Sequence, residues 1–453
     1  MNYTTQKQSA IERLKYLMTG DIVQPGSANY ERFRKIWSGA ITDQPAAIAL
    51  PETAEDVQTA VKWAGYHRIP LSVLGGGHDW AGRGLNDGGL VLNLQKLKSI
   101  EIDPAERTAV VGGGITGREL IAAADPFGLV AVTGSCGSVG LAGWALGGGY
   151  GLLSSSYGLG VDNLLSADLV LADGSLVKAN ENENPDLFWA IRGGGGNFGV
   201  VTSMTIRLHP AKPLLAGMIL FAWSEAETVL KGYAALMEAA PDQLSMLAGL
   251  IPGPDGIPLF FLVPAWNGDI ATGEKYIAAL KQLGTPVMEQ VSQMKYFELL
   301  GMFDPHIVNG RHYDIQTRWL PRLDSDSISA IVKAGANRSS PLTLLNMHPF
   351  HGAPTRVPLS DTAFGLRAPH FLVEIITTWE PMDGANSATH RRWASDLSEN
   401  LAKNALPGGY PNFLVPDQHS QIARAYGDNL SRLQNVKKAY DKENFFKAIP
   451  IPR

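Results

Sequence analysis

The sequence predicts an α+β protein in which a glycine-rich first domain precedes a domain with a mostly antiparallel sheet, covered by helices on one face. The chain has 453 residues, which favours two domains over one. Glycine accounts for 49 residues, and its runs at 75–77, 112–114, 147–149 and 193–196 all lie in the first 200 residues. Beyond about residue 210 these runs stop, and longer strands and helices are predicted instead. We therefore expect domains over 1–210 and 211–404, and a C-terminal segment over 405–453.

The first domain is expected to begin with a helix over 9–18, followed by a strand, a helix and a strand across 47–74. Pro51 and Thr53 precede this second helix and acidic residues occupy its first turn, which is typical of a helix start. Alternating apolar residues predict strands at 89–94, 98–103 and 108–114, before a helix over 116–124. Residues 163–180 resemble a β-hairpin that turns at Asp173 and Gly174. A short helix from 185, a glycine loop and a strand then end the domain near 210.

The second domain contains three apolar segments expected to be strands, at 217–223, 244–251 and 258–266. The last two are joined through the turn-forming residues 252–256. Helices are expected over 270–283 and 325–334, then strands at 342–350 and 370–380 and a helix over 385–403. The remaining chain is expected to form a loop from 410 and a helix within 423–446.

Composition excludes several classes of protein. Apolar residues make up 45% of the chain and charged residues 18%, so a large core is available and disorder is not expected. The net charge of −5 argues against a nucleic-acid partner. The first residues are too polar for a secretory signal, and no apolar run could span a bilayer, so we expect a cytoplasmic protein without a membrane partner. A monomer and a homodimer both remain possible.

Two glycine-rich stretches carry the residues most suited to chemistry. The segment 133–163 holds Cys136, which is the single cysteine of the chain, and the segment 74–84 holds His78. Glycine allows the backbone to approach a ligand closely, so we expect these stretches to hold one flat cofactor between them. The alternative is that the glycines are only tight turns of a β-rich domain. The first loop lacks the GxGxxG pattern that opens a helix in dinucleotide-binding folds.

With these stretches placed, the chain resembles the berberine-bridge-enzyme-like flavin oxidases of the vanillyl-alcohol-oxidase superfamily. The resemblance rests on GGGHDWAGRG, CGSVGLAGWALGGGYGLLSSSYGLGVDN, PDLFWAIRGGGGNFGVVT, YPNF and YDKENFF, and covers nearly the whole length. It implies a PCMH-type FAD-binding domain of two α/β subdomains and a substrate domain with a large antiparallel sheet covered by helices. It also implies that the C-terminal segment returns to the FAD domain.

The resemblance implies FAD bonded to His78 through the 8α carbon and to Cys136 through C6. Imidazole nitrogen and thiolate are nucleophiles suited to an electron-poor ring. The bland alternatives are a loop histidine and an inert buried thiol. The implied cofactor-binding residues also include Gly75, Gly76, Gly77, Gly82, Val139, Gly140, Gly143, Gly147, Gly148, Asn197, Gly199, Val201, Tyr410 and Asn412. The chain departs from the family at Leu74 and Gly75, where Arg-Ser is usual, and at Trp144, where histidine is common.

Three residues are the catalytic candidates. Tyr150 and Tyr410 match active-site tyrosines of the family, and Glu374 matches a glutamate base of members that oxidise alkaloids. Glu374 also lies in an apolar segment, FLVEIITTW, where a carboxylate is usually paired or has a raised pKa. Otherwise it is a solvent-facing strand residue. Five other polar residues of the second domain could face the substrate and are given no role: Arg311, Tyr313, Gln316, His348 and His351.

The expected function is that of an oxidase. Val139 lies three residues after the linked cysteine, where the family has valine when O2 can reach the flavin. A hydride would pass from an alcohol, hemiacetal or amine carbon of a bulky small molecule to the flavin and then to O2, giving H2O2. Alkaloid-like molecules, secondary metabolites and oligosaccharides are the candidate substrates. A dehydrogenase with another acceptor and a flavin-binding protein without turnover are the alternatives. No metal-binding or serine-hydrolase pattern is present.

Overall fold

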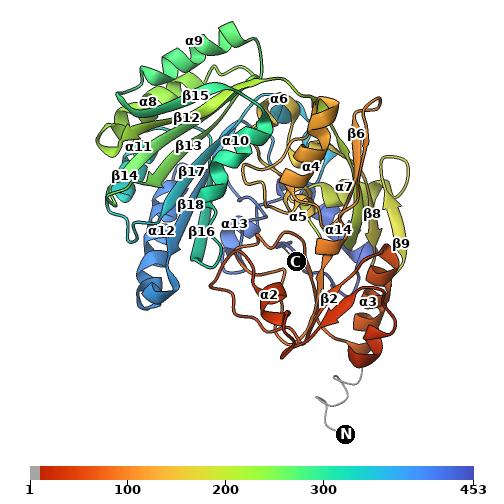
Figure 1. Cartoon of the computed structure of the whole chain (residues 1–453). Coiled ribbons are helices and arrows are strands. Elements are labelled where there is room, and N and C mark those ends of the chain that lie inside the picture. The colour runs from red at the N-terminus through yellow and green to blue at the C-terminus, as the bar shows by residue number, and fades with distance from the viewer. Residues whose placement is uncertain (1–10, 453) are drawn as a thin grey trace.

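The structure is a computed structural model that describes residues 11–452 (Figure 1). The expected helix over 9–18 begins outside the described residues, and its described part is helical at 11–15. Within the described part, the chain forms two sheets in the glycine-rich half, a two-stranded ribbon of β7 (Leu129–Val130) and β11 (His209–Pro210), and one large sheet beyond it. The expected α+β architecture, with two α/β subdomains and a large antiparallel sheet, is confirmed. The exact domain boundaries stay a prediction.

The first sheet has four strands in the order β1–β2–β4–β3. They are β1 (Asp21–Val23), β2 (Ala47–Leu50), β4 (Leu90–Asn93) and β3 (Leu71–Leu74). The expected strand–helix–strand unit is β2, α3 (Ala54–His67) and β3, with β4 inserted as a parallel strand between the two. Thr53 caps α3 by accepting a hydrogen bond from the Asp56 backbone nitrogen. The glycine loop 75–77 begins directly at the end of a half-buried parallel strand.

The second sheet has five antiparallel strands in the order β5–β6–β10–β8–β9. They are β5 (Ile100–Asp103), β6 (Thr108–Gly112), β10 (Val200–Arg207), β8 (Leu164–Val170) and β9 (Leu176–Ala179). The expected hairpin is β8–β9, and Gly174 in its turn has φ +77°, which glycine adopts without steric cost. The helices of this half are α2 (Tyr30–Arg34), α4 (Gly117–Ala124), α5 (Leu141–Leu146), α6 (Ser154–Tyr157) and α7 (Pro185–Gly194).

The large sheet has seven strands, all antiparallel, in the order β15–β12–β14–β13–β17–β18–β16. Five of them match expected strands: β12 (Leu214–Ala222), β13 (Leu244–Pro252), β14 (Pro258–Trp266), β17 (Leu344–Phe350) and β18 (His370–Trp379). The two edge strands, β15 (Pro286–Met294) and β16 (His312–Leu320), were not expected, nor were α8 (Ala226–Met237) and α10 (Tyr296–Phe303). β18 is buried along its whole length, which makes it the central support of the site described below.

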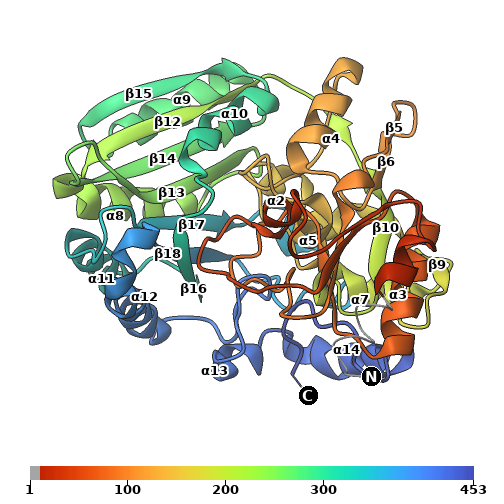
Figure 2. The ribbon, with the colours of Figure 1, turned by 60° about the horizontal axis from the view of Figure 1, so that its bottom comes forward.

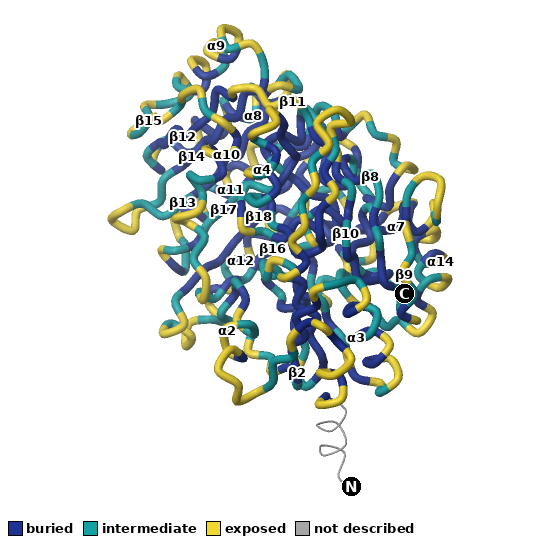
Figure 3. Tube along the Cα trace, turned by 45° about the vertical axis from the view of Figure 1, so that its right-hand side comes forward, coloured by how far each residue is buried: buried dark blue, intermediate teal, exposed yellow. Residues whose placement is uncertain are grey.

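Helices cover one face of the large sheet, and the glycine-rich half covers the other (Figure 1). The covering helices are α8, α9 (Ile270–Lys281), α11 (Ser325–Ala336) and α12 (Ser387–Ala402). Their apolar residues pack with the sheet into one cluster, while residues from the opposite face of β12, β13 and β14 join the core of the glycine-rich half. Figure 3 shows the resulting buried interior, with the exposed residues gathered on outer helices and loops. The two halves therefore share a continuous core.

The C-terminal segment runs along the glycine-rich half. It contains α13 (His419–Ile422) and α14 (Leu430–Tyr440), and α14 lies beside α7 (Figure 2). Asn197 ties the last residues down, because its side chain accepts a hydrogen bond from the Ala448 nitrogen and donates one to the Ile449 carbonyl. Residues 446–449 are thereby held against the loop that follows α7. Among residues 11–452, no helix has the length and apolar character needed to cross a membrane.

Candidate active site

A cleft of about 400 Å³ lies between the glycine loops and the inner face of the large sheet. One wall is made by the glycine-rich stretches 71–84, 134–146 and 195–201 together with residues 446–449. The opposite wall contains Ile315 of β16, His348 of β17, and Glu374 and Ile376 of β18. Tyr150, Tyr410, Asn412 and Phe413 line it as well. Residues more than 300 positions apart therefore meet around one space.

Two glycine loops contact each other at the cleft, and their backbone atoms form part of its wall. A Cβ on Gly76 would lie 2.2 Å from the Gly140 nitrogen, so these two loops could not approach each other this closely with any other residue at position 76. Gly75 and Gly143, in contrast, would meet no atom within 4 Å and therefore face open space in the cleft. Peptide groups are thus exposed to whatever occupies the cleft, as expected for loops that hold a ligand through the backbone.

His78 and Cys136 both contact the side chain of one serine, Ser138. The Ser138 hydroxyl lies 2.8 Å from His78 Nε2 and 3.2 Å from Cys136 Sγ. His78 also stacks against Trp37, whose ring lies 5.7 Å away. Burial lowers the pKa of His78 to about 4, so the imidazole is neutral near pH 7. Burial also raises the pKa of the Cys136 thiol, although hydrogen bonds from Ser138 and Val139 oppose that rise.

Tyr150 reaches the cleft from the third glycine run and is held from behind by a histidine. Its hydroxyl lies 2.8 Å from His370 Nε2, and His370 Nδ1 lies 2.8 Å from the Ala368 carbonyl. His370 is only 3% exposed and stacks on Phe350, with the ring centroids 4.4 Å apart. Burial lowers the pKa of His370 to about 3 and raises that of Tyr150 well above its usual value. Both side chains are therefore neutral near pH 7.

Tyr410 is held from the opposite side by two donors. Its hydroxyl accepts hydrogen bonds from the Gly149 nitrogen and from Asn412 Nδ2, each at 3.0 Å. Its ring lies 5.0 Å from that of Tyr150. Burial raises the pKa of Tyr410 despite the two donors. Arg83 fixes this loop by donating to the backbone carbonyls of Asn412 and Leu414, and it is itself paired with Asp79 at 2.7 Å.

Glu374 points into the cleft rather than to solvent, and it is 7% exposed. Asn346 Nδ2 donates to its Oε2 at 3.1 Å, and His348 Nε2 lies 3.4 Å from its Oε1. These contacts follow from strand register, because Asn346 lies opposite Glu374 in the β17–β18 pair and His348 lies opposite Leu372. The three side chains share one face of the sheet. His348, which was given no role from sequence, therefore lines the cleft beside the candidate base.

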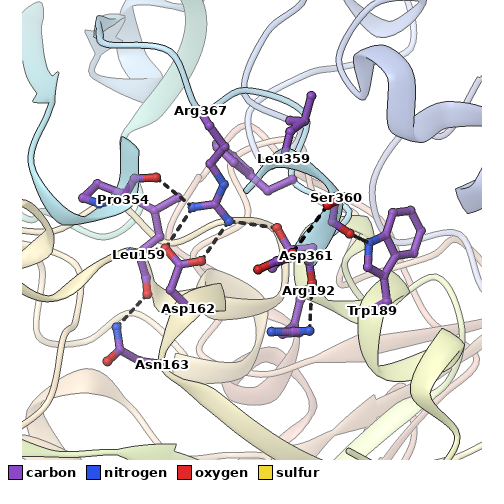
Figure 4. Close-up of polar contacts among 12 residues, drawn as sticks. Leu159, Asp162, Asn163, Trp189, Arg192, Pro354, Leu359, Ser360, Asp361 and Arg367 are labelled. Carbon is purple, nitrogen blue, oxygen red and sulfur yellow. Dashed lines mark hydrogen bonds and ion pairs between the residues drawn. The ribbon is translucent and has the colours of Figure 1, made fainter. Parts of the chain in front are cut away.

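A buried ion pair joins the end of the cysteine stretch to the loop before β18. Arg367 donates to both carboxylate oxygens of Asp162 at 2.8 and 2.9 Å, to Thr362 Oγ1 at 2.8 Å and to the Pro354 carbonyl (Figure 4). The Asp162 carboxylate in turn accepts from the Leu159 nitrogen at 2.9 Å. The glycine-rich segment that follows Tyr150 is therefore tied to the strand that carries Glu374.

Most of the site residues predicted from sequence line the cleft. They are Gly75, Gly76, Gly77, His78, Cys136, Val139, Gly140, Gly143, Tyr150, Gly199, Val201, Glu374, Tyr410 and Asn412. Four do not, namely Gly82, Gly147, Gly148 and Asn197. At these positions a Cβ on Gly82 would collide with Ile41, one on Gly147 with Asn412 and one on Gly148 with Tyr410, while Asn197 ties down the tail, so their binding to a cofactor stays a prediction.

The sequence also left parts of the cleft wall unassigned, among them Trp37, Trp80, Arg83 and Lys447. Trp37 carried no local signal, whereas Lys447 directly follows the YDKENFF segment and Trp80 and Arg83 lie within GGGHDWAGRG, so these three could have been assigned from the motifs. Trp144, which stands where histidine is common in the resembled family, donates through Nε1 to the Tyr150 carbonyl at 3.0 Å. It supports the loop that carries Tyr150. No cluster of His, Cys, Asp or Glu suited to a metal ion occurs within the described range 11–452.

Comparison with known proteins identifies relatives across the whole fold. A family model described as an FAD binding domain matches residues 45–180, and one described as berberine and berberine like matches residues 409–449. (R)-6-Hydroxynicotine oxidase of Paenarthrobacter nicotinovorans is 36% identical over 94% of this chain and 95% of that protein. The structure of 6-hydroxy-D-nicotine oxidase from Arthrobacter nicotinovorans superposes with a TM-score of 0.87 at 30% identity, covering 96% of this chain and 98% of that one.

A more distant structure shares the fold. Glucooligosaccharide oxidase of Acremonium strictum, described with a 6-S-cysteinyl, 8α-N1-histidyl FAD, has a TM-score of 0.85 at 22% identity. The alignment covers 98% of this chain and 99% of that one.

Proposed function

The chain belongs to the berberine-bridge-enzyme-like family of FAD-linked oxidoreductases, and from that premise we propose that it is an oxidase whose flavin is bonded to both His78 and Cys136. The observation that carries the proposal is the meeting of two sets of residues in one cleft. His78 and Cys136 lie within reach of a shared serine, and Glu374, Tyr150 and Tyr410 line the same space. A tether and an acid–base group thus share one site.

The residues of the cleft fit FAD. Gly75 and Gly143 leave open the space that a Cβ would fill, so the glycine loops let a flat ring system approach their backbone closely. Val139 and Gly140, beside Cys136, also line the wall, and Gly195, Gly196 and residues 446–449 extend it. When bound, FAD supplies the acceptor for a hydride from the substrate and passes the electrons to O2.

Two features support covalent attachment through these two residues. The Ser138 hydroxyl occupies His78 Nε2, which leaves Nδ1 as the ring nitrogen without a partner among the described residues. His78 is neutral near pH 7, as a nucleophile must be. Each bond would replace one hydrogen on His78 or Cys136 and one on the cofactor, and the two electrons and two protons released would be taken up by O2 to give H2O2.

The attachment is tested by denaturing the purified protein and measuring its mass and absorption spectrum. We expect the flavin to stay with the chain in the wild type, in His78→Ala and in Cys136→Ala, and to be released from the double variant. Equal flavin content before denaturation provides the control for binding. Release of free FAD from the denatured wild type would contradict the proposal outright.

Glu374 is the base that the geometry supports best. Its carboxylate faces the cleft and is held by Asn346 and His348, whereas burial raises the pKa of Tyr150 and of Tyr410, so both phenols stay protonated near pH 7. Glu374 takes the proton from the hydroxyl or amine group while the hydride leaves the adjacent carbon, which gives a carbonyl or imine product. Aromatic and aliphatic residues line the space around it, among them Trp37, Trp80, Phe413, Ile315 and Ile376.

The substrate is a bulky small molecule with an oxidisable alcohol, hemiacetal or amine. An alkaloid-like amine or a secondary-metabolite alcohol suits a carboxylate in an apolar wall, and the alignment with (R)-6-hydroxynicotine oxidase supports the amine class. A sugar hemiacetal is the second candidate. It is supported by the shared fold with glucooligosaccharide oxidase.

Two measurements test turnover and the oxidant. Anaerobic mixing with candidate substrates of each class should bleach the flavin absorbance, and a broad panel without bleaching would favour a binding protein without turnover. Stoichiometric release of H2O2 under air is expected from an oxidase. Bleaching without H2O2 would identify a dehydrogenase that uses another acceptor.

A further inference from the structure

Two tyrosines present opposite hydrogen-bonding groups to the same cleft. Tyr150 and Tyr410 both line it, with their rings 5.0 Å apart at an interplanar angle of 73°. A neutral phenol can donate one hydrogen bond and accept others, so its role toward a ligand depends on which of its own groups the protein already uses. The partners of each tyrosine decide this.

The Tyr150 hydroxyl already donates its proton to a protein group. His370 Nδ1 lies 2.8 Å from the Ala368 carbonyl, and since a carbonyl can only accept, Nδ1 carries the ring proton. His370 Nε2 then carries a lone pair, and the Tyr150 hydroxyl donates a hydrogen bond to it at 2.8 Å. The Tyr150 proton therefore points toward His370, which does not line the cleft. Toward a ligand in the cleft, the Tyr150 oxygen can only accept.

His370 is locked in this state. Its ring stacks on Phe350, meets the Tyr150 ring edge-on and lies 5.7 Å from the Trp319 ring, with almost no exposed surface. Burial lowers its pKa to about 3, so near pH 7 it neither carries a second proton nor takes one from Tyr150. Of the charged groups, Arg367 lowers the pKa of Tyr150 and Glu374 raises it, and Arg367 is already paired with Asp162. The direction of the Tyr150–His370 bond is therefore fixed.

The Tyr410 hydroxyl oxygen, in contrast, already accepts two hydrogen bonds from protein groups. The Gly149 nitrogen and Asn412 Nδ2 both donate to its oxygen. The Asn412 amide orientation is set independently, because the same Nδ2 lies 3.3 Å from the carbonyls of Gly143 and Trp144. Among the described residues no acceptor takes the Tyr410 proton. That proton is available for a ligand, so toward the cleft Tyr410 is a donor.

We propose that Tyr150 and Tyr410 act as a pair that selects, apart from the group that Glu374 deprotonates, a substrate group able to donate and accept hydrogen bonds through one atom. A hydroxyl or a neutral secondary amine satisfies both tyrosines at once. An ether can only accept and an ammonium can only donate, so each leaves one tyrosine unsatisfied in a buried site, which is costly. His370 is the positioning residue that sets the polarity of Tyr150. The inference rests on the proposed function insofar as the cleft is the substrate site.

Binding of small aromatic probes to the flavin-loaded protein tests the pair without any turnover. Phenol donates and accepts through one oxygen, anisole only accepts, and toluene does neither. Calorimetric titration should show phenol binding about three- to tenfold more tightly than anisole, which corresponds to one hydrogen bond. Tyr150→Phe removes the acceptor and should abolish that preference. Equal affinities for phenol and anisole in the wild type would overturn the proposal.

Variants of His370 then test its role as the positioning residue. His370→Phe keeps an aromatic ring against Phe350 but removes the acceptor, so the Tyr150 proton can turn into the cleft and the preference for phenol over anisole should vanish or reverse. His370→Gln offers a side-chain carbonyl as acceptor for the Tyr150 proton, so this variant should keep part of the preference for phenol over anisole. Phe350→Leu is the matched control, since it disturbs the same packing without removing a hydrogen bond. If Phe350→Leu changes the phenol-to-anisole ratio as much as His370→Phe, the polarity argument is wrong.

A spectroscopic measurement covers the case in which His370→Phe does not fold. Nitrogen-15 NMR of histidine-labelled wild type should show a His370 ring protonated at Nδ1 and not at Nε2 at pH 7, with the signal assigned by its loss in His370→Gln. A proton on Nε2 would overturn the proposal. Loss of H2O2 formation with the phenol preference intact would affect only the proposed function. An active oxidase without that preference would affect only the tyrosine pair.

Discussion

Replacing Arg367 with methionine should lower the free energy of unfolding by about 3–5 kcal/mol, the usual cost of leaving one member of a buried ion pair alone. The guanidinium side chain is only 6% exposed, and its partner Asp162 is 9% exposed. Without Arg367, the Asp162 carboxylate would keep a single hydrogen bond, from the Leu159 nitrogen, in a largely buried site. Methionine fills much of the same volume, so the loss of the charge dominates over a packing defect.

The double variant Arg367→Met with Asp162→Asn separates the pair from its surroundings. It removes both charges, so it should be more stable than the sum of the two single effects predicts, by about 0.5–3 kcal/mol. Urea unfolding followed by tryptophan fluorescence gives the free energies, provided that the m value is unchanged. Lys231→Met is the control for loss of a cation, because its pair with Glu227 is 56% exposed on both sides and is worth at most about 1 kcal/mol.

Two results would refute the reasoning. One is a loss below about 1 kcal/mol in Arg367→Met, which would place the pair with ordinary surface pairs. The other is strict additivity in the double variant, which would mean that Arg367 and Asp162 do not interact. Because the pair ties the segment after Tyr150 to the loop before β18, we also expect Arg367→Met to lose activity at a lower temperature than the wild type.

Three further predictions concern catalysis and pH. Glu374→Gln should lower the rate of anaerobic flavin reduction by about 10²–10⁴-fold with a smaller change in substrate affinity, measured by stopped-flow absorbance, and an unchanged rate would remove Glu374 as the base. Val139→Ile should slow reoxidation of the chemically reduced flavin by O2 at least about tenfold, or ~1.4 kcal/mol of activation free energy, and equal rates would exclude Val139 as a control of O2 access. His370 has a folded pKa of about 3, below the ordinary 6.5, so the unfolded chain binds its proton first and stability falls as pH drops from about 6.5 toward 3. His370→Gln should flatten that decline in urea unfolding by up to about 1.4 kcal/mol per pH unit, and an identical slope would contradict the buried neutral imidazole.

Local patterns predicted much of this fold because the elements concerned are defined by neighbouring residues. The β8–β9 hairpin follows from alternation around Asp173 and Gly174, and β13 and β14 follow from apolar runs on either side of a Pro/Gly-rich turn. The helix α3 follows from its cap at Thr53. Such signals need no knowledge of the rest of the molecule. They were therefore readable from the sequence.

The two edge strands, β15 and β16, were not predicted from the sequence, and the reasons differ. β15 is partly or fully exposed along its length, so its sequence PVMEQVSQM lacks the apolar face that marks a half-buried strand. In β16 the buried positions 313, 315, 317 and 319 do alternate with polar ones, and this signal was available in HYDIQTRWL. Its apolar face is interrupted by Thr317, which weakens the pattern.

The cleft was predicted on its glycine side more completely than on its sheet side. His78, Cys136 and Tyr150 lie in segments whose glycines mark them as special, whereas His348 lies 26 positions before Glu374 with a long connection between their strands. Only the register of β17 against β18 puts His348 and Asn346 on the face of Glu374. The role of His370 was hidden for the same reason, because its contact with Tyr150 spans 220 positions.

The return of residues 446–449 to the cleft has a consequence for how the protein is made. Val201, on the first wall, is synthesised about 245 residues before Phe446, which at ~5–20 residues per second is a delay of about 12–50 s. During that interval the nascent chain has its glycine loops but not the segment that Asn197 binds. The complete wall of the cleft therefore forms only after translation has passed residue 449.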